Sequence, residues 1–88
     1  MKITVTVTQE HHDRAESARK CGDPRHRTCD IAQAFWDLGY TSVSVGSGTF
    51  TLNSQMWGSL PLEARQLTRD VDFGHPVKFP IAFEVNAE

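Results

Sequence analysis

The chain of 88 residues lacks any long apolar run, and no segment approaches the roughly 20 apolar residues that a membrane-spanning helix needs. The first residues, from Met1 to Val5, also lack the apolar stretch and the small-residue cleavage site of a secretory signal peptide. Internal repeats and low-complexity segments are absent as well. We therefore expect no membrane partner and a cytoplasmic location.

Positive charge is scarce. Lys and Arg number 9 against 11 Asp and Glu, for a net charge of −2. The basic residues gather before residue 31, so that residues 1–30 carry a net charge of +1 and residues 31–88 carry −3. General nucleic-acid binders rely on positive charge that neutralises phosphates, and the positive charge of this chain is too small for that. Direct binding to nucleic acid is therefore the less favoured expectation.

Cysteine is scarce too, with only Cys21 and Cys29 in the chain. In a reducing cytoplasm both would be thiols or metal ligands rather than a permanent disulfide. A chain of this length forms one domain and buries only about two thirds of the surface that its unfolded form exposes. We expect a single domain over residues 1–88, stabilised by a metal, a disulfide or a partner.

The chain does contain readable periodicity. Residues 3–8 alternate Ile or Val with Thr, which is typical of a half-buried strand. Thr8 is placed to cap a helix over about residues 9–20, which is polar almost all round except for Ala15 and Ala18. Such a helix is marginal by itself, so we expect other contacts to hold it.

A second helix is predicted between a cap at Thr28 and a natural stop at Gly39. Its core stripe, spaced i, i+3, i+4 and i+7, consists of Ile31, Ala34, Phe35 and Leu38. Two strands over residues 41–45 and 49–52 follow, joined by a glycine-containing turn. Residues 53–59 are predicted to form a loop.

A third helix is predicted from about Leu60 to the Gly74-His75-Pro76 segment, followed by a strand over residues 81–86. The apolar stripe of this helix consists of Leu60, Ala64, Leu67 and Val71. The resulting order is β-α-α-β-β-α-β. It predicts an α+β domain with a four-stranded, largely antiparallel sheet covered by helices, with the terminal strands as neighbours.

Histidines and both cysteines gather between residues 11 and 29. Two thiolates and two imidazoles are ligands that tetrahedral zinc prefers, and the candidate set is His12, Cys21, His26 and Cys29. His12 and Cys21 lie about 13 Å apart along a straight helix, so the chain must fold back to join them. A disulfide, or two packed thiols beside solvated histidines, are the alternatives.

Catalytic chemistry finds little support. Cys29, near a helix N-terminus and beside His26 and Arg27, has the ingredients of an activated thiol, but no orienting acid or oxyanion hole is evident. Asp70 and Asp72 are interpreted as the solvated end of a helix. We therefore expect a non-enzymatic protein that requires no cofactor, with zinc as a structural option.

Two features suit a partner-binding surface. Trp and Met are enriched in the cores of protein interfaces, and Trp57 follows Met56 in a predicted loop. Acidic residues of the C-terminal half are candidates for a face that imitates DNA phosphates. The predicted partner-binding residues are Asp37, Trp57, Glu63, Asp70 and Asp72.

Three segments carry a resemblance to a group of proteins. They are residues 1–11 (MKITVTVTQEH), residues 29–35 (CDIAQAF) and residues 72–85 (DFGHPVKFPIAFEV). They resemble small uncharacterised proteins of bacteriophages and prophages. That group often has a Cys-x-x-Cys pair before the second helix, whereas seven residues separate Cys21 from Cys29 here. The resemblance therefore carries no metal site over to this chain.

Phage proteins of this size include inhibitors of host defence, anti-CRISPR proteins among them. The resemblance therefore implies a binding protein that acts in the cytoplasm of a bacterial host. Its partner would be a host protein or ribonucleoprotein complex, with a CRISPR effector as the leading expectation. The alternative is a zinc-stabilised nucleic-acid-binding module that uses the Arg/His loop over residues 25–27.

Overall fold

The computed structural model describes residues 1–22 and 29–88, and it shows one compact α+β domain. Its helices are α1 (Gln9–Lys20), α2 (Asp30–Asp37) and α3 (Leu62–Asp72). Its strands are β1 (Lys2–Val7), β2 (Val43–Val45), β3 (Thr49–Leu52), β4 (Met56–Ser59) and β5 (Ile81–Asn86). Among the described residues, no helix has the length and apolar character to cross a bilayer.

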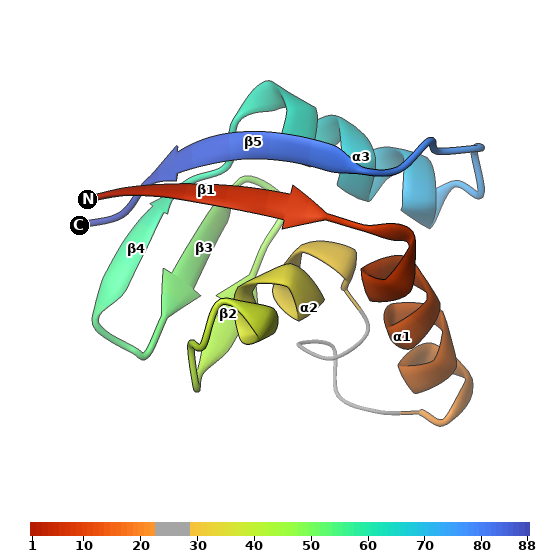
Figure 1. Ribbon diagram of the computed structural model, residues 1–88, viewed down its shortest axis with the longest axis horizontal. Coiled ribbons are helices and arrows are strands. Elements are labelled where there is room, and N and C mark those ends of the chain that lie inside the picture. The colour runs from red at the N-terminus through yellow and green to blue at the C-terminus, as the bar shows by residue number, and fades with distance from the viewer. Residues whose placement is uncertain (23–28) are drawn as a thin grey trace.

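The terminal strands pair with each other, as predicted. β1 and β5 are antiparallel, with Ile3 opposite Val85 and Val5 opposite Phe83. The Ile and Val side chains of β1 are buried and its Thr side chains are exposed, because successive side chains of a strand point to opposite faces. The two ends of the chain consequently lie side by side at one end of the molecule (Figure 1).

The predicted four-stranded sheet is wrong. The described strands form two antiparallel sheets, one of β1 and β5 and one in the order β2-β3-β4. Residues 53–59 were expected to be a loop, yet β4 pairs with β3, and Trp57 lies opposite Thr51. The turn before β4 contains Asn53 and Ser54 in the left-handed region, with φ of 54° and 60°.

The two sheets meet at a close backbone approach. The N–H of Trp57 donates to the carbonyl of Glu88 (2.9 Å) and the N–H of Glu88 donates back to Trp57 (2.8 Å). At Gly58, a Cβ would lie 2.2 Å from the Asn86 carbonyl oxygen and 2.7 Å from the Phe50 ring. Glycine is therefore required on β4, and its low strand propensity is why the sequence pattern concealed this strand.

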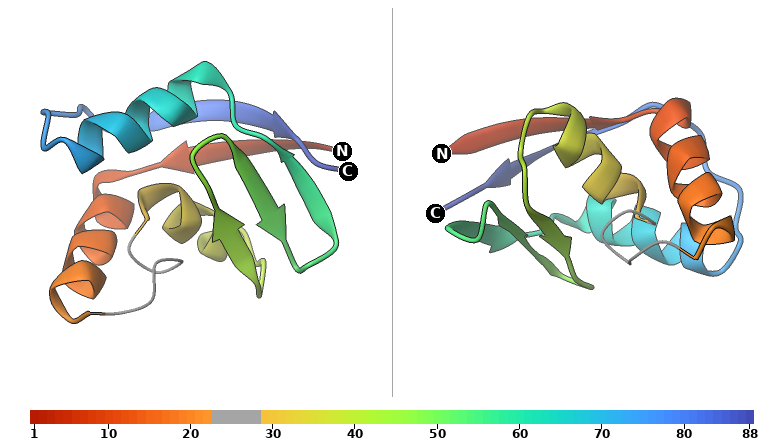
Figure 2. Two further views of the ribbon diagram at one scale, coloured as in Figure 1. Left: turned by 180° about the vertical axis from the view of Figure 1, so that it is seen from behind. Right: turned by 90° about the horizontal axis from the view of Figure 1, so that it is seen from below.

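α2 is the central helix. It contacts β1, β2, α1 and α3, so it lies between the other elements rather than on one sheet (Figure 2). Of its predicted stripe, Ile31, Ala34 and Phe35 are buried, while Leu38 lies beyond the helix and is 49% exposed. Cys29 occupies the N-cap position, and the predicted cap Thr28 lies outside the described residues.

The core combines residues of every layer. α3 begins at Leu62, two residues later than predicted, and Leu60 is buried just before it. Ala64 and Leu67 are the buried residues of α3. The largest fully buried side chains are Phe35, Phe50, Ile31, Leu52, Leu60, Leu67, Val5, Val7 and Val85.

Candidate functional site

The first turn of α1 is built by a reciprocal cap. The N–H of His11 donates to the Thr8 hydroxyl (3.3 Å), and the N–H of Thr8 donates to His11 Nδ1 (2.9 Å). Because Nδ1 accepts this bond, the proton of the His11 ring lies on Nε2, which donates to Asp37 Oδ2 (2.6 Å). The predicted cap at Thr8 is confirmed, and His11 extends it into a contact with α2.

Asp37, at the end of α2, also binds Arg14. The guanidinium donates to both carboxylate oxygens of Asp37, with an Nη1–Oδ1 distance of 3.1 Å. This hydrogen bond from Arg14, together with that from His11, lowers the pKa of Asp37 to about 2. The carboxylate is therefore ionised at neutral pH, and its oxygens are already bound by Arg14 and His11 of α1.

The next histidine holds the other end of α2. His12 Nδ1 lies 2.7 Å from Oδ2 of Asp30, the first residue of α2. The Asp30 side chain is only 3% exposed, and its burial raises its pKa, although the hydrogen bond from His12 opposes that rise. His12 also stacks on Phe79 with a ring-centroid distance of 5.3 Å. We call His11, His12, Arg14, Asp30 and Asp37 the α1–α2 junction.

The predicted metal ligands lie around this junction. Cys21 is the exposed C-cap of α1, Cys29 is the half-buried N-cap of α2, and both are free thiols. His26 lies outside the described residues. In the described ranges 1–22 and 29–88, no three His, Cys, Asp or Glu side chains are grouped as metal ligands. Of the predicted set, His12 is engaged by a carboxylate instead.

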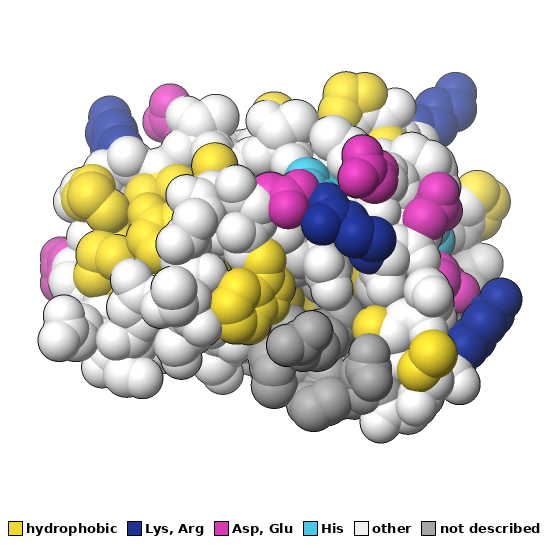
Figure 3. All heavy atoms as spheres, turned by 60° about the horizontal axis from the view of Figure 1, so that its bottom comes forward, with side chains coloured by type: hydrophobic (Ala, Val, Ile, Leu, Met, Phe, Trp, Pro, Cys, Tyr) yellow, Lys and Arg dark blue, Asp and Glu magenta, His cyan; other side chains and the backbone are white. Residues whose placement is uncertain are grey.

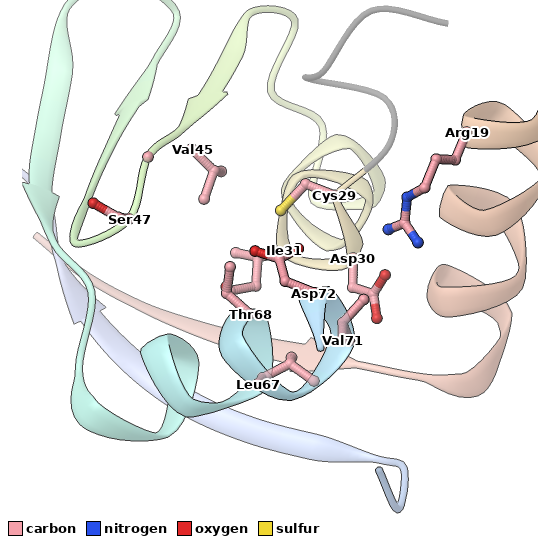
Figure 4. Close-up of a pocket in the computed structure, with 11 residues that line it drawn as sticks. Arg19, Cys29, Asp30, Ile31, Val45, Ser47, Leu67, Thr68, Val71 and Asp72 are labelled. Atoms are coloured by element: carbon pink, nitrogen blue, oxygen red, sulfur yellow. The ribbon is translucent and has the colours of Figure 1, made fainter. Parts of the chain in front are cut away.

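Cys29 lines a cavity next to the junction. The cavity lies between the start of α2, the inner side of α3 and the turn that joins β2 to β3, and has a volume of about 120 Å³. We call it the α2–α3 cavity. In Figure 4 the Asp30 carboxyl group and the Arg19 guanidinium extend toward each other from α2 and α1, while the Cys29 sulfur points toward the strands.

The Cys29 thiol is not activated. Burial raises its pKa, although the backbone amides of Ala32 and Ile31 oppose that rise. The thiolate is the nucleophilic form of cysteine, so a raised pKa leaves less of it at neutral pH. Burial thus works against an activated Cys29, while His26 and Arg27, the predicted activating neighbours, lie outside the described residues.

The structure separates the predicted acidic partner-binding residues. Asp37 is on α2 and is bound by Arg14, whereas Glu63, Asp70 and Asp72 are on α3. Asp70 is half-buried and accepts a hydrogen bond from Gln66 (3.1 Å), while Asp72 lines the α2–α3 cavity. On the face of the molecule drawn in Figure 3, acidic and basic side chains lie next to each other and beside a histidine, rather than forming an acidic patch.

Trp57 lies on a different kind of surface. Its side chain is 55% exposed on the face of β2, β3 and β4 that points away from the core. The exposed residues of that face, which we call the tryptophan face, are Ser44, Thr49, Thr51, Trp57 and Ser59. Residues 38–62 contain no Lys, Arg, Asp or Glu, so the tryptophan face is uncharged.

Sequence reasoning did not find the partners of the two histidines. A signal was present, because Asp30 and Asp37 are seven residues apart and therefore lie on the same side of α2, two turns from each other. Comparison of the chain with protein-family models, curated proteins and solved structures found no match.

Proposed function

We propose that this chain is a non-enzymatic binding protein of phage type, which inhibits a macromolecular complex of a bacterial host by docking through Trp57. The observation that carries the proposal is the 55% exposure of Trp57 on a strand. A large aromatic side chain on an otherwise hydroxyl-bearing face is the composition of an interface anchor, since Trp residues dominate interface hot spots.

Charge favours the tryptophan face over an acidic one. Asp37 is paired with Arg14 and His11, and Asp70 with Gln66, so binding a basic partner there would first break contacts within the chain. The tryptophan face has no such internal ion pairs to lose, because its residues are uncharged. Docking through this face requires no cofactor, and we do not expect nucleic acid to bind there.

The partner proposed first is a CRISPR effector complex in the bacterial cytoplasm. The test is capture of purified effector complexes by the tagged chain, comparing the wild type with Trp57→Ala and Phe73→Ala. Phe73 is a matched control, since it is an aromatic residue, 71% exposed, that lies just after α3. We expect Trp57→Ala to weaken capture by about 30-fold, which corresponds to a hot-spot loss of about 2 kcal/mol, and Phe73→Ala to leave it unchanged.

Two results would move the contact elsewhere. Equal capture by wild type and Trp57→Ala would remove the tryptophan face from the proposal. If charge reversal at Asp70 and Asp72 abolished capture instead, the acidic residues of α3 would make the contact. Titration of duplex DNA at low salt completes the test, because salt-sensitive binding would support the nucleic-acid-binding alternative.

A further inference from the structure

Glu88 lies directly beside the tryptophan face. The N–H of Trp57 donates to the Glu88 carbonyl and the N–H of Glu88 donates back, so these residues are directly opposed, as in an antiparallel pair. Both views in Figure 2 show the last residues of the chain next to β4. Directly opposed side chains project to the same face, with Cβ atoms about 5 Å apart. The Glu88 side chain therefore stands next to the Trp57 ring.

Burial agrees with this orientation. Ala87 is only 3% exposed and Glu88 is exposed, so the alternation of β5 continues beyond Asn86 and turns Glu88 outward. On β4, a Cβ at Gly58 would meet the buried Phe50 ring, so the preceding residue, Trp57, points outward. The ring and the carboxylate thus share the solvent side of the sheet.

A hydroxyl lies on the other side of the ring. Thr51 is exposed and stands opposite Trp57 in the pairing of β3 with β4. We call Thr51, Trp57 and Glu88 the tryptophan–glutamate row. The face of an indole ring is electron-rich, and hydroxyl and carboxylate oxygens accept hydrogen bonds. All three members of the row can therefore receive a cationic donor.

The ring and the carboxylate are available to a partner. Within residues 1–22 and 29–88, the Trp57 ring has no aromatic or cationic contact, and the Glu88 carboxylate has no ion pair or hydrogen bond. Two cations lie nearby without pairing with it: the Met1 ammonium, which donates to the Ala87 carbonyl (3.0 Å), and Lys2 on β1. A partner would therefore break no internal ion pair of Glu88.

Charge favours a cationic occupant. Residues 38–62 contain no Lys or Arg that would repel a cation from the ring, and residues 31–88 carry a net charge of −3. A cation over a Trp ring is stabilised most when it is desolvated, as it is inside an interface. An adjacent carboxylate adds a charge-assisted hydrogen bond.

We propose that the tryptophan–glutamate row binds an arginine side chain of the partner, with the guanidinium stacked on Trp57 and donating to the Glu88 carboxylate. A guanidinium is planar, stacks on aromatic rings and presents N–H donors in a fork that matches a carboxylate, whereas an ammonium is a compact, strongly hydrated charge. This inference rests on the proposed docking through Trp57 and names the chemistry of the partner at that site.

Three matched peptides test the chemistry. They are capped tripeptides with a central arginine, lysine or citrulline between two glycines, and citrulline keeps the planar shape of arginine without its charge. Binding is measured in the full chain from the NMR shift of the Trp57 indole N–H, with the Trp36 indole as an internal reference. We expect the arginine peptide to bind about tenfold more tightly than the citrulline peptide and about threefold more tightly than the lysine peptide. Equal affinity for arginine and citrulline, or no shift of the Trp57 signal, would overturn the proposal.

Substitutions test the carboxylate. Glu88→Gln should weaken binding of the arginine peptide by about fivefold, because the amide has no charge to pair with the guanidinium. Glu84→Gln is the matched control, since Glu84 is also an exposed carboxylate but lies opposite Thr4 on β1. The control should bind the arginine peptide as the wild type does. Both side chains are exposed, so both variants should fold, and unchanged affinity in Glu88→Gln would sink the proposal.

Capture of effector complexes separates this inference from the proposed docking. If Trp57→Ala weakens capture while Glu88→Gln leaves both capture and peptide binding intact, docking through Trp57 stands and arginine recognition is wrong. If Trp57→Ala leaves capture intact but the arginine peptide still binds as expected, the row recognises arginine and the docking contact lies elsewhere. Weaker capture by both variants, with Glu84→Gln unchanged, is the result that we expect.

Discussion

The α1–α2 junction and the β2–β4 sheet stabilise the domain by different physics. In the junction, consecutive histidines bind carboxylates at the two ends of α2, and Arg14 joins one of them. In the sheet, the strands contain no charged residue. Their close contact with the rest of the domain is the approach of the β5 backbone to Gly58. The ionisable side chains of the junction thus hold α1 against α2, whereas the uncharged sheet carries the exposed Trp57.

The two carboxylates of the junction differ from each other as well. Asp37 is half-exposed and accepts from two donors, so its pKa falls to about 2. Asp30 is buried, and this burial raises its pKa, while its second oxygen has no hydrogen-bond partner among the described residues. The same kind of pair therefore has opposite electrostatic outcomes, and burial decides which. The stability lost through substitutions in the junction should therefore depend on pH, and the stability lost through substitutions in the sheet should not.

The largest expected effect is that of His12→Ala. The substitution leaves the buried Asp30 carboxylate with neither oxygen bonded and removes the stacking on Phe79. Leaving a buried carboxylate without its partner should lower the free energy of unfolding by about 3 kcal/mol. Urea denaturation measures the loss. His75→Ala is the control, because the His75 side chain is 62% exposed, and a loss equal to that of the control would contradict the role of the pair.

Gly58→Ala should come next, at about 2 kcal/mol, because its Cβ would overlap the Asn86 carbonyl and the Phe50 ring. The loss should be the same at pH 4 and pH 7, since no ionisable side chain is involved. Gly48→Ala is a suitable control, for a Cβ there lies 4.0 Å from Arg65. A strongly pH-dependent loss in Gly58→Ala would break the distinction between the two regions.

Smaller effects should appear in acid, with opposite signs for the two carboxylates. Asp37 stabilises the fold above its unfolded pKa of 3.8, and this contribution is lost as the pH falls toward about 2. Asp37→Asn should therefore lose stability relative to the wild type as the pH rises through this window. The loss should stay within about 1 kcal/mol, because the pair is solvent-screened.

Asp30→Asn should show the reverse trend. Because the folded-state pKa of Asp30 is raised, the ionised carboxylate costs stability as the pH rises from 3.8 through that raised value. The stability of Asp30→Asn relative to the wild type should therefore increase with pH over the same scan. Parallel trends in the two variants would show that burial does not separate the two pairs. Unfolding free energies from pH 2 to pH 7 supply both tests.

The smallest expected effect on stability is that of Trp57→Ala. More than half of the side chain is already in solvent, so the loss should stay below about 1 kcal/mol and should not vary with pH. Together with a large loss of partner capture, this result would identify Trp57 as a binding residue. A loss of several kcal/mol by thermal denaturation would instead make Trp57 part of the fold.

Local patterns predicted much of the fold. The alternation in residues 2–7 and 81–86 gave both terminal strands, and Thr8 correctly marked the start of α1. Patterns failed where a long-range contact sets the conformation. β4 contains a glycine that is explained by the approach of the Asn86 carbonyl and the Phe50 ring, and β4 pairs with β3 in a sheet separate from that of the terminal strands.

The candidate site shows the same division. The sequence pointed to the histidines and cysteines of residues 11–29, and to α1 as a helix that needs outside contacts. It did not reveal that Asp30 and Asp37 supply those contacts, because their distance to the histidines depends on how α1 crosses α2. It also placed Trp57 in a loop, whereas the structure puts it on a strand whose outer face is exposed.

By itself, the sequence determined the α+β class, the strands and helices with clear periodicity, and the concentration of ionisable groups near the N-terminus. Those properties follow from side-chain order along the chain, which local propensity and periodicity encode. Only the tertiary structure decided which carboxylate meets which histidine, that Asp30 is buried with an unpaired oxygen, and that Trp57 is exposed. These properties depend on the packing of elements distant in sequence, because burial and partner distance exist only once the elements meet.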